Sequence, residues 1–508
     1  MVQPLLSAAS RLNFADVRHG RTVAAWLVCT TLIAAIVLLT FSPTLDNAFL
    51  PLGFDDGLIL ETPAIRALTW GNLRSVATEF NRVNYIPVTM SSFAVQYAIS
   101  GFEPFGYHLV NVLLHTATAI LVFVFLVPIA PSRRVALTAA LIWAVHPVQM
   151  ATVAVAAERK TLLSGFFCVL TLIAYQQWKG SGARRYYAAA LLAFVLGGLS
   201  KAMAVSLPPI LLLYDYVFLG RPLRWLEKVP FCAIAAAISC AALLGHAHEA
   251  ALIPPHGASL LTHTLIVSRA TLEYVTALFL PLDLVPMYYY SRTMIFEPIN
   301  FLAVVLIAFV CAYVTVFRRR YPWSFFCLWW FVLMLLPESN VVPLAQLRAD
   351  RYLYLPLLGF ALWVALGLCR LPSSIAIRRR WRVPLREMGF VVAGLLALIS
   401  YNYSGVWHDQ VTVWTRVAER YPGNPAARSL LGRAYMSLND DVDAEYMLRD
   451  ALQLEKPPAD TYFYLAKLYA AHGMIEPATA SLHRYLELAP NDPEGQELLA
   501  ALVPTGDS

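Results

Sequence analysis

The sequence predicts an all-α membrane protein that continues into a C-terminal domain of helical repeats. The 508 residues are 59% hydrophobic and only 14% charged, which excludes a single soluble domain. Apolar stretches of membrane-spanning length recur from about residue 22 to about residue 405. Beyond Trp414 the chain becomes polar and repeats with a period of about 34 residues. We therefore divide it into a polytopic membrane domain, 1–405, and a repeat domain, 406–508.

Eleven apolar stretches are expected to cross the bilayer. The first runs from Val23 to Phe41 and has no small-residue cleavage pattern after it, so we expect it to remain as a span. The expected spans are 22–42, 106–128, 135–152, 161–178, 186–200, 203–219, 229–246, 300–317, 323–339, 353–370 and 387–404. One further stretch, 260–281, contains Arg269 and Glu273, and we place it at the outer surface as an interfacial or re-entrant helix.

The orientation follows from the basic loops between these stretches. Positively charged short loops are typical of the cytoplasmic side of a membrane protein. Here they are formed by Arg133 and Arg134, Lys179 with Arg184 and Arg185, Arg221 with Arg224 and Lys228, Arg318 to Arg320, and Arg378 to Arg386, while Arg11, Arg18 and Arg21 precede the first span. An odd number of spans then puts the N-terminus inside and the repeats outside. Since the formal charge of +6 comes from these loops, it does not indicate a nucleic-acid partner.

The cysteines give no sign of a metal centre. All seven lie in or at the edges of apolar stretches, and none has the spacing of metal ligands. We interpret them as small core residues. Neither a metal nor another cofactor is indicated by the sequence.

The repeat domain is identified by positions that recur one period apart. Leu431, Tyr435, Ala444 and Leu448 return as Leu465, Tyr469, Ala478 and Leu482. Small residues at 432 and 466 allow paired helices to approach closely. The pattern matches the tetratricopeptide repeat. Two repeats with flanking helices at about 409–421 and 493–502 are expected to bind a protein or peptide, or to act as a structural cap.

Two adjacent carboxylates, Asp55 and Asp56, follow the first span at the expected outer surface. Such a pair is unfavourable beside a membrane unless water, a cation or a reaction uses it. A transferase needs a carboxylate of this kind when it removes a proton from an acceptor hydroxyl. The structural alternative is a turn or a helix cap.

Further polar residues are expected at the same surface. His108, Asn111 and His115 share one face of a helix. The arginines and lysines expected there are candidates for binding a lipid phosphate. Positive charge is usually concentrated on the cytoplasmic side of a membrane protein, so its presence on the outer side calls for an anion. The remaining candidates are His146, Glu158, Arg159, Lys160, Lys201, Arg348 and Arg351. Each has a structural alternative: helix-end shaping, hydrogen bonds between helices, ion pairing or contact with lipid headgroups.

Taken together, these motifs resemble the transmembrane and tetratricopeptide-repeat O-mannosyltransferases and their bacterial relatives, of the class C glycosyltransferase superfamily. The resemblance covers nearly the whole chain and rests on the order of its motifs. They are Phe54-Asp55-Asp56, Tyr85-Ile86-Pro87-Val88-Thr89, Pro104 to Asn111, His146-Pro147-Val148-Gln149, Arg159, Ser200-Lys201, Leu213-Tyr214-Asp215, Arg351 to Pro356, Trp407 and Trp414.

The resemblance implies a transferase that moves a mannose-like sugar from a polyprenyl phosphate to a protein or envelope-glycan hydroxyl. Asp55 and Asp56 would carry the catalytic base, with Asp55 favoured, on the periplasmic or lumenal side. Arg159, Lys160, Lys201, Arg348 and Arg351 would hold the donor phosphate. His108, Asn111, His115, His146 and Glu158 would line the acceptor pocket. Neither a nucleotide sugar nor an obligatory metal is implied.

The chain departs from its relatives at two positions, where Ala151 and Ala202 stand in place of common acidic residues. We expect the outer pocket to be more positive as a result. The short loops favour a bacterial inner membrane over the endoplasmic reticulum. Two other functions remain open: a membrane scaffold that recruits partners through its repeats, and a carrier for a lipid-linked sugar. The acidic pair argues against the scaffold, and the clustering of charge at one face argues against the carrier.

Overall fold

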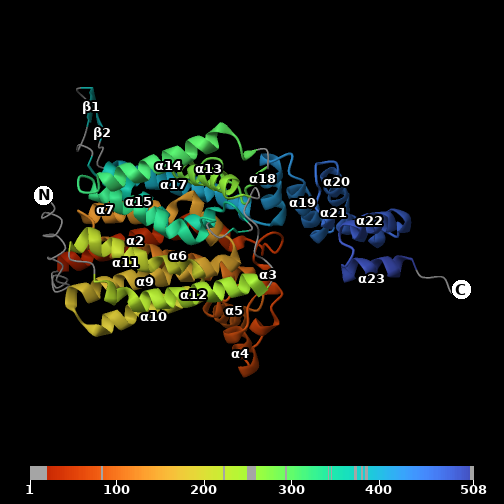
Figure 1. The fold of residues 1–508 in the computed structure, drawn as a ribbon, viewed down its shortest axis with the longest axis horizontal. Coiled ribbons are helices and arrows are strands. Elements are labelled where there is room, and N and C mark those ends of the chain that lie inside the picture. The colour runs from red at the N-terminus through yellow and green to blue at the C-terminus, as the bar shows by residue number, and fades with distance from the viewer. Residues whose placement is uncertain are drawn as a thin grey trace. The chain divides into compact units, whose positions relative to one another are not determined.

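A computed structural model describes residues 20–81, 84–220, 224–248, 259–291, 294–340, 343–344, 346–370, 375–378, 381–383 and 387–503 (Figure 1). The chain divides into two compact units. The first contains 55–284 and 290–405 together with the residues up to Asn47. The second contains 406–508 and two short earlier stretches, Ala48–Phe54 and Val285–Tyr289. The sequence analysis kept both stretches in the membrane domain.

The first unit is a bundle of helices. They are α2 (Gly20–Phe41), α3 (Gly57–Leu60), α4 (Trp70–Thr78), α5 (Pro87–Ser100), α6 (Pro104–Leu126), α7 (Arg133–Val145), α8 (Met150–Val153), α9 (Arg159–Ser181), α10 (Arg184–Ser200), α11 (Leu207–Tyr214), α12 (Val229–His248), α13 (Leu260–Phe279), α14 (Pro298–Val316), α15 (Pro322–Leu335), α16 (Leu357–Leu368) and α17 (Met388–Tyr403). A short antiparallel hairpin joins the last two, with strands β1 (Ile375–Arg378) and β2 (Trp381–Val383). The predicted all-α class is confirmed, apart from this hairpin.

Each of the eleven expected spans contains one of these helices. Among the described residues, seven helices are long and apolar enough to cross a membrane, or eight if the bent pair formed by α7 and the segment Pro147–Val153 is one span. The others are shorter: α15 and α16 are apolar but short, and α10 has only 17 residues. The polytopic character is therefore confirmed, whereas the count of eleven spans remains a prediction.

Ion pairs lie at both ends of the bundle. At one end, Arg134 forms an ion pair with Glu387 at 3.0 Å, and Lys179 pairs with Glu227. The predicted cytoplasmic loops that the structure describes lie at this end, together with the β1–β2 hairpin. Residues Arg11, Arg18 and Arg221 lie outside the described part of the chain. Helices α3 and α5 lie at the opposite end (Figure 1), and Asp55 lies two residues before the start of α3. The helices thus alternate in direction as the basic loops predict.

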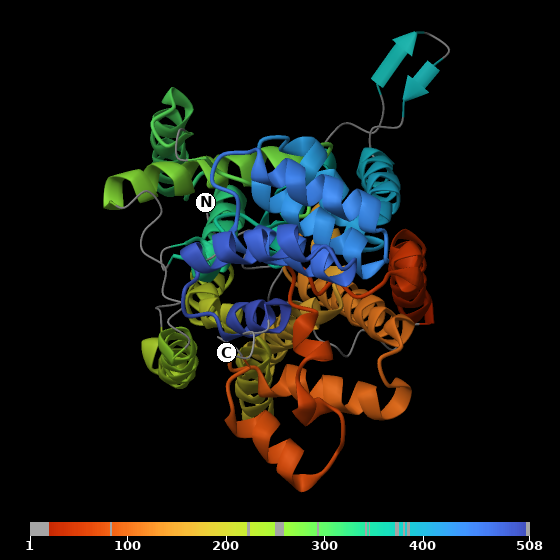
Figure 2. The ribbon, with the colours of Figure 1, turned by 90° about the vertical axis from the view of Figure 1, so that its right-hand side faces the viewer.

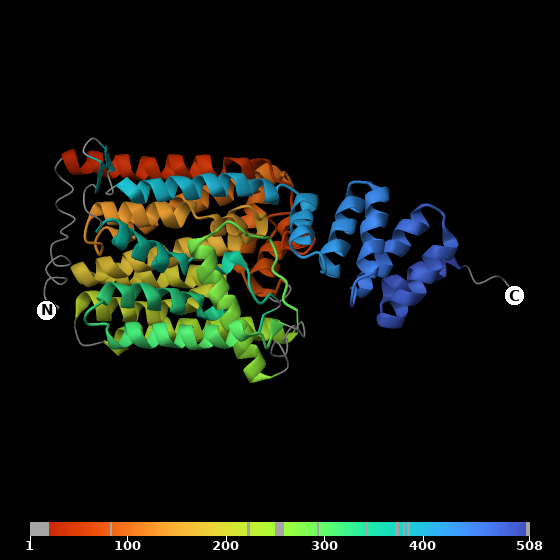
Figure 3. The same ribbon diagram turned by 90° about the horizontal axis from the view of Figure 1, so that it is seen from above.

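Helix α13 occupies the stretch that the sequence placed at the outer surface. Its N-terminus is closed by a capping box between Ser259 and Thr262. It packs against α14 and is inclined to the long helices of the bundle (Figure 3). Arg269 on α13 pairs with Glu273 at 2.9 Å and with Glu297 at 2.5 Å, which accounts for the charges within this apolar stretch.

The second unit is built from α18 (Gln410–Arg420), α19 (Pro425–Ser437), α20 (Asp441–Leu452), α21 (Ala459–Ala471), α22 (Ile475–Leu488) and α23 (Pro493–Leu502), drawn in blue in Figure 2. The recurring positions form its core, since Ala444, Ala478, Leu448 and Leu482 are fully buried. A Cβ at Gly432 would lie 2.8 Å from Leu448 Cγ, so this glycine allows α19 and α20 to pack closely. Both predicted flanking helices are present as α18 and α23.

Candidate functional site

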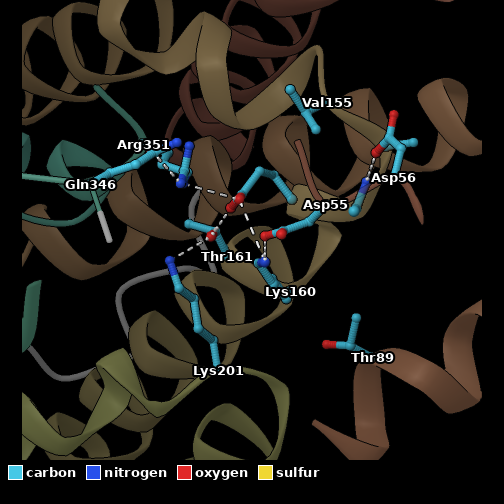
Figure 4. Close-up of polar contacts among 12 residues, drawn as sticks. Asp55, Asp56, Thr89, Val155, Lys160, Thr161, Lys201, Gln346 and Arg351 are labelled. Carbon is cyan, nitrogen blue, oxygen red and sulfur yellow. Dashed lines mark hydrogen bonds and ion pairs between the residues drawn. The ribbon is translucent and has the colours of Figure 1, made fainter. Parts of the chain in front are cut away.

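Asp55 and Asp56 occupy different environments although they are adjacent. Both precede α3, and the Asp55 carbonyl accepts a hydrogen bond from Leu58 N at 2.8 Å. The Asp56 side chain is fully buried and accepts a hydrogen bond from Ala157 N at 2.7 Å. The Asp55 side chain is 38% exposed and points to Lys160 instead (Figure 4). Asp55 is thus the carboxylate that a substrate can reach, and Asp56 anchors the loop.

Lys160 joins Asp55 to a buried acidic residue. Its ammonium forms an ion pair with Asp55 and lies 3.7 Å from Glu158 Oε1. Glu158 ends the short turn Ala156–Glu158 that leads into α9, and it accepts a hydrogen bond from Thr161 Oγ1 at 2.5 Å. All these groups lie at the N-terminus of α9, where the helix dipole favours an anion.

Two more cations reach the same cluster from distant segments (Figure 4). Arg351 Nε lies 3.3 Å from Glu158 Oε1, and its Nη2 donates to Gln346 Oε1 at 2.8 Å. Lys201 follows α10 and donates to Thr161 Oγ1 at 3.1 Å. Lys201 also pairs with Glu338, just after α15, at 2.5 Å. Five separate stretches of the chain therefore meet here.

The backbone around the cluster is held by hydrogen bonds that explain several of the sequence motifs. Thr89 Oγ1 donates to the Ser200 carbonyl at 3.0 Å, and Ser164 Oγ donates to the Lys201 carbonyl at 3.2 Å. The residues after Arg351 are fixed in the same way: Trp143 Nε1 donates to the Tyr354 carbonyl at 2.7 Å. The cations thus stand on a rigid frame, which is what a binding site for a charged group requires.

The cluster contains as many acidic as basic side chains, and the expectation drawn from Ala151 and Ala202, that the pocket is more positive than in relatives, stays a prediction. Its charged members are the carboxylates of Asp55, Glu158 and Glu338 and the cations of Lys160, Lys201 and Arg351. Glu338 supplies an acidic partner to Lys201 from a segment that is remote in the sequence.

Neighbouring charges control the ionisation of Asp55 and Arg351. The charge of Lys160 holds the pKa of Asp55 well below its ordinary value, and Arg351 and Lys201 add to this against the opposing effect of burial. For Arg351, burial opposes the charged form. The carboxylates around it outweigh that effect and raise its pKa. Asp55 is therefore ionised over the whole physiological range, and Lys160 lowers its strength as a base.

Arg159 turns away from this cluster. Its Nε donates to Asn111 Oδ1 at 3.2 Å, its Nη2 donates to the Tyr107 carbonyl at 3.1 Å, and its guanidinium lies over the Phe93 ring. Asn111 in turn donates to the carbonyls of Val155 and Ala156. The two residues support the turn that carries Glu158, and the structure does not bring Arg159 together with Lys160, Lys201 and Arg351.

The histidines are buried inside the bundle. His108 and His115 lie on α6 and have no exposed surface. His115 Nε2 lies 2.8 Å from the Ala144 carbonyl, and its Nδ1 lies 3.1 Å from Tyr354 Oη. His146 ends α7 and lies 3.1 Å from the Leu278 carbonyl. The contacts of His115 and His146 correspond to the structural alternative predicted for these residues, hydrogen bonds between helices.

Arg348 belongs to a second group centred on α13. It pairs with Glu273 at 3.1 Å and lies 4.0 Å from Asp350 Oδ1. Tyr274 exchanges two hydrogen bonds with the backbone of Ala349, at 2.9 and 3.3 Å. This group therefore holds the backbone of the three residues that precede Arg351, and it is not part of the cluster around Asp55.

Three residues of the cluster were not predicted from the sequence: Glu338, Thr161 and Gln346. Glu338 lies at the outer end of an expected span, after Leu336-Pro337, and an acid at that position could have been noticed. Thr161 and Gln346 carry no comparable signal. Among the described residues, no group of three or more His, Cys, Asp or Glu could hold a metal ion.

Comparisons with known proteins agree with this architecture. Residues 87–246 match the family described as dolichyl-phosphate-mannose-protein mannosyltransferase, and residues 442–502 match the tetratricopeptide repeat. The chain is 29% identical over 223 residues to the protein O-mannosyl-transferase TMTC4 of Homo sapiens, a match to 37% of this chain and 29% of that protein. It is 36% identical over 110 residues to Tmtc1 of Drosophila melanogaster, covering 22% of this chain and 12% of that protein.

A third relative, the protein O-mannosyl-transferase tmtc2 of Xenopus laevis, is 30% identical over 162 residues, which is 30% of this chain and 19% of that protein. The chain thus spans less than a third of the length of these curated relatives. The matches nevertheless cover both parts of the molecule, the helical bundle and the repeats. The chain is thus similar to dolichyl-phosphate-mannose-protein mannosyltransferases in part of its helical bundle and to tetratricopeptide-repeat proteins in its C-terminal unit, the combination found in the O-mannosyl-transferases named above.

Proposed function

We propose that this protein is a membrane glycosyltransferase that moves a mannose-like hexose from a polyprenyl phosphate to a hydroxyl of a protein or an envelope glycan. The reaction takes place at the end of the bundle that carries Asp55, on the periplasmic or lumenal side of the membrane. One observation carries the proposal: a reachable carboxylate lies beside three cations that converge from separate segments. The names of the relatives support the same class of activity.

The cations of the cluster bind the donor phosphate. Lys160, Lys201 and Arg351 are paired with carboxylates in the structure, and a phosphate competes for the same charge-assisted contacts. Arg351 presents a planar fork suited to phosphate oxygens, and the two lysines act as point charges. The polyprenyl chain stays in the bilayer while its headgroup reaches the end of the bundle.

Asp55 acts as the base in a single displacement. The acceptor oxygen forms a bond to the anomeric carbon as the bond from that carbon to the phosphate oxygen breaks. The acceptor proton passes to Asp55, and the bonding electrons leave with the polyprenyl phosphate, which the cations stabilise. Attack opposite the leaving group inverts the anomeric carbon. This scheme needs neither a nucleotide sugar nor a metal.

The pairing of Asp55 with Lys160 links donor binding to catalysis. Lys160 weakens Asp55 as a base while the two form an ion pair. A bound donor phosphate attracts Lys160, so the carboxylate becomes more basic when there is a sugar to transfer. The repeats of the second unit, which match a protein-binding repeat family, position the acceptor.

The test measures donor binding and sugar transfer separately on the full-length protein. Asp55→Asn keeps the size of the side chain but cannot accept a proton, so turnover should fall about 10²- to 10⁴-fold while donor affinity is retained. Arg351→Ala should act on donor affinity instead. It should weaken donor binding by about ten- to a hundredfold, because one charge-assisted contact to the phosphate is lost. Glycan mass spectrometry of acceptor proteins and envelope polysaccharides would identify the product.

Glu103→Gln is the matched control, because this acidic residue precedes α6 outside the cluster. It should leave both quantities unchanged. Transfer at the parent rate by purified Asp55→Asn protein would rule out Asp55 as the base. Unchanged donor affinity in Arg351→Ala, Lys160→Ala and Lys201→Ala would rule out the phosphate site.

A further inference from the structure

The stretch of chain that leads into Asp55 is packed against α18. Ala48–Phe54 belongs to the second unit, whereas the next residue, Asp55, begins a part of the first unit. Ala48 N donates to the His408 carbonyl at 2.8 Å. At the other end of the stretch, Trp414 Nε1 donates to the Leu52 carbonyl at 3.2 Å. The segment is thus held at both ends by hydrogen bonds to its backbone, one from the main chain and one from the Trp414 side chain.

The fit around Trp414 is close. Gly53 has φ of +76°, which favours glycine, and a Cβ there would collide with the six-membered ring of Trp414. The Phe54 ring lies 5.9 Å from the Trp414 ring and 5.6 Å from the Trp407 ring. Trp414 is completely buried, and its indole N–H also donates to Gln410 Oε1 at 3.0 Å. Two tryptophans therefore clamp the residue that immediately precedes Asp55.

We infer that Trp414 is a positioning residue for Asp55: it fixes Leu52, Gly53 and Phe54, and through the next peptide bond it sets the place of the catalytic carboxylate. This role rests on the proposed function. It means that α18, the first helix of the repeat unit, controls the position of Asp55 through Trp414. It gives the short acidic loop two anchors, one on each side of Asp55. The first is Phe54 against Trp414, and the second is Asp56 on Ala157 N.

Two anchors are needed because the loop itself is short. Asp55 lies in a turn, and its side chain is more than a third exposed, so its own contacts leave it free to move once Lys160 turns to a donor phosphate. A base must stay within hydrogen-bond reach of the proton that it removes. A displacement of about 1 Å at a reacting group can cost about 10²-fold in rate. Loss of the Trp414 anchor should therefore lower turnover without altering the phosphate site.

The experiment compares turnover, donor affinity and thermal stability of the full-length protein in three variants. Trp414→Ala removes the anchor, Gly53→Ala pushes the segment away from the ring, and Trp414→Phe keeps an aromatic ring without the N–H. We expect Trp414→Ala and Gly53→Ala each to lower kcat by about ten- to a hundredfold with unchanged donor affinity. Trp414→Phe should recover much of the loss.

Phe218→Ala is the matched control. It removes a buried aromatic ring that packs against Trp323 and Phe326 at the end of the segment Ala202–Leu219 remote from Lys201, so it should lower the stability of the protein without changing kcat. If Trp414→Ala does not fold, Gly53→Ala decides the question. Parent-like kcat in the folded variants, with Asp55→Asn inactive, would overturn this inference alone. An active Asp55→Asn variant would instead overturn the proposed function.

Discussion

The contact between Asp55 and Lys160 distinguishes Asp55 from its neighbour Asp56. The sequence marked both residues as candidates, but it could not tell that they are partners, because 105 positions separate them. It also could not separate Asp55 from Asp56, since adjacent residues share every feature of local composition. Their distinction comes from the tertiary structure, where one carboxylate meets Ala157 N and the other faces a lysine.

Arg159 and Lys160 form the complementary case. The sequence assigned both to the donor phosphate, yet successive positions of a helix point about 100° apart, so the two cannot face one site equally. Lys160 faces Asp55, and Arg159 faces Asn111. Helical geometry alone could have raised this objection, but it could not have said which of the two would face the cluster.

The effect of Lys160 on Asp55 predicts a pH dependence. Lys160 holds the pKa of Asp55 low, so the base stays ionised as the pH falls through about 3.9, the usual value for an aspartate. In Lys160→Met this attraction is lost while burial still raises the pKa. The acid limb of kcat/KM should therefore move to higher pH in the variant.

Lys179→Met is the control for this profile, because Lys179 pairs with Glu227 at the opposite end of the bundle. It should keep the parent acid limb. Ionised Asp55 also stabilises the folded protein. This contribution to the free energy of unfolding is present above the pKa of Asp55 in the unfolded chain, and it is lost as the pH falls through the lower pKa of Asp55 in the folded protein. An identical acid limb in Lys160→Met and the parent would mean that Lys160 does not control Asp55.

At the scale of elements, the positions of helices were predictable and their breaks were not. Long apolar stretches indicate helices by length alone, and the 34-residue period identified the repeat helices. The break after α7 is different. His146-Pro147 bends the path by 50° and brings the turn at Ala156–Glu158 to the start of α9. The proline predicts a break, but its direction depends on the neighbouring helices.

Helix α16 offers a test of close packing with its own internal control. A Cβ at Gly359 would collide with the Cys327 carbonyl of α15 and would lie 3.1 Å from Trp330 Cδ1, so the backbones must move apart. Gly359→Ala should therefore destabilise the protein by about 1–3 kcal/mol. At Gly367, eight residues further along, a Cβ meets nothing within 4 Å. Gly367→Ala should be neutral or should stabilise by up to about 1 kcal/mol.

Thermal unfolding of both variants in one detergent measures the difference. Because α16 leads directly from the Arg351 segment, loss of its packing should also weaken donor binding in Gly359→Ala. Equal stability of the two variants would show that α15 and α16 are not in close contact.

At the scale of the whole molecule, the alternating charge of the loops predicted which residues gather at one end of the bundle. The predicted residues Asp55, Lys160, Lys201 and Arg351 do lie together there, although they come from four stretches of the chain, and Glu338, which was not predicted, joins them. The inclusion of 48–54 and 285–289 in the repeat unit could not be read from composition. Both stretches are short, and each makes contacts within that unit, such as the contact of the Tyr289 ring with the Tyr421 ring and that of Phe54 with Trp414.

The same charge pattern predicts that the repeats lie on the outer side of the membrane. Helix α17 ends at Tyr403, at the end of the bundle that carries Asp55, and the repeat unit follows it in the chain. A reporter that is active only in the cytoplasm should therefore be silent when fused at the C-terminus. Fused after Gly182, in the basic turn between α9 and α10, the same reporter should be bright. The reverse pattern would invert the proposed orientation, and a bright signal from both fusions would contradict the odd number of spans.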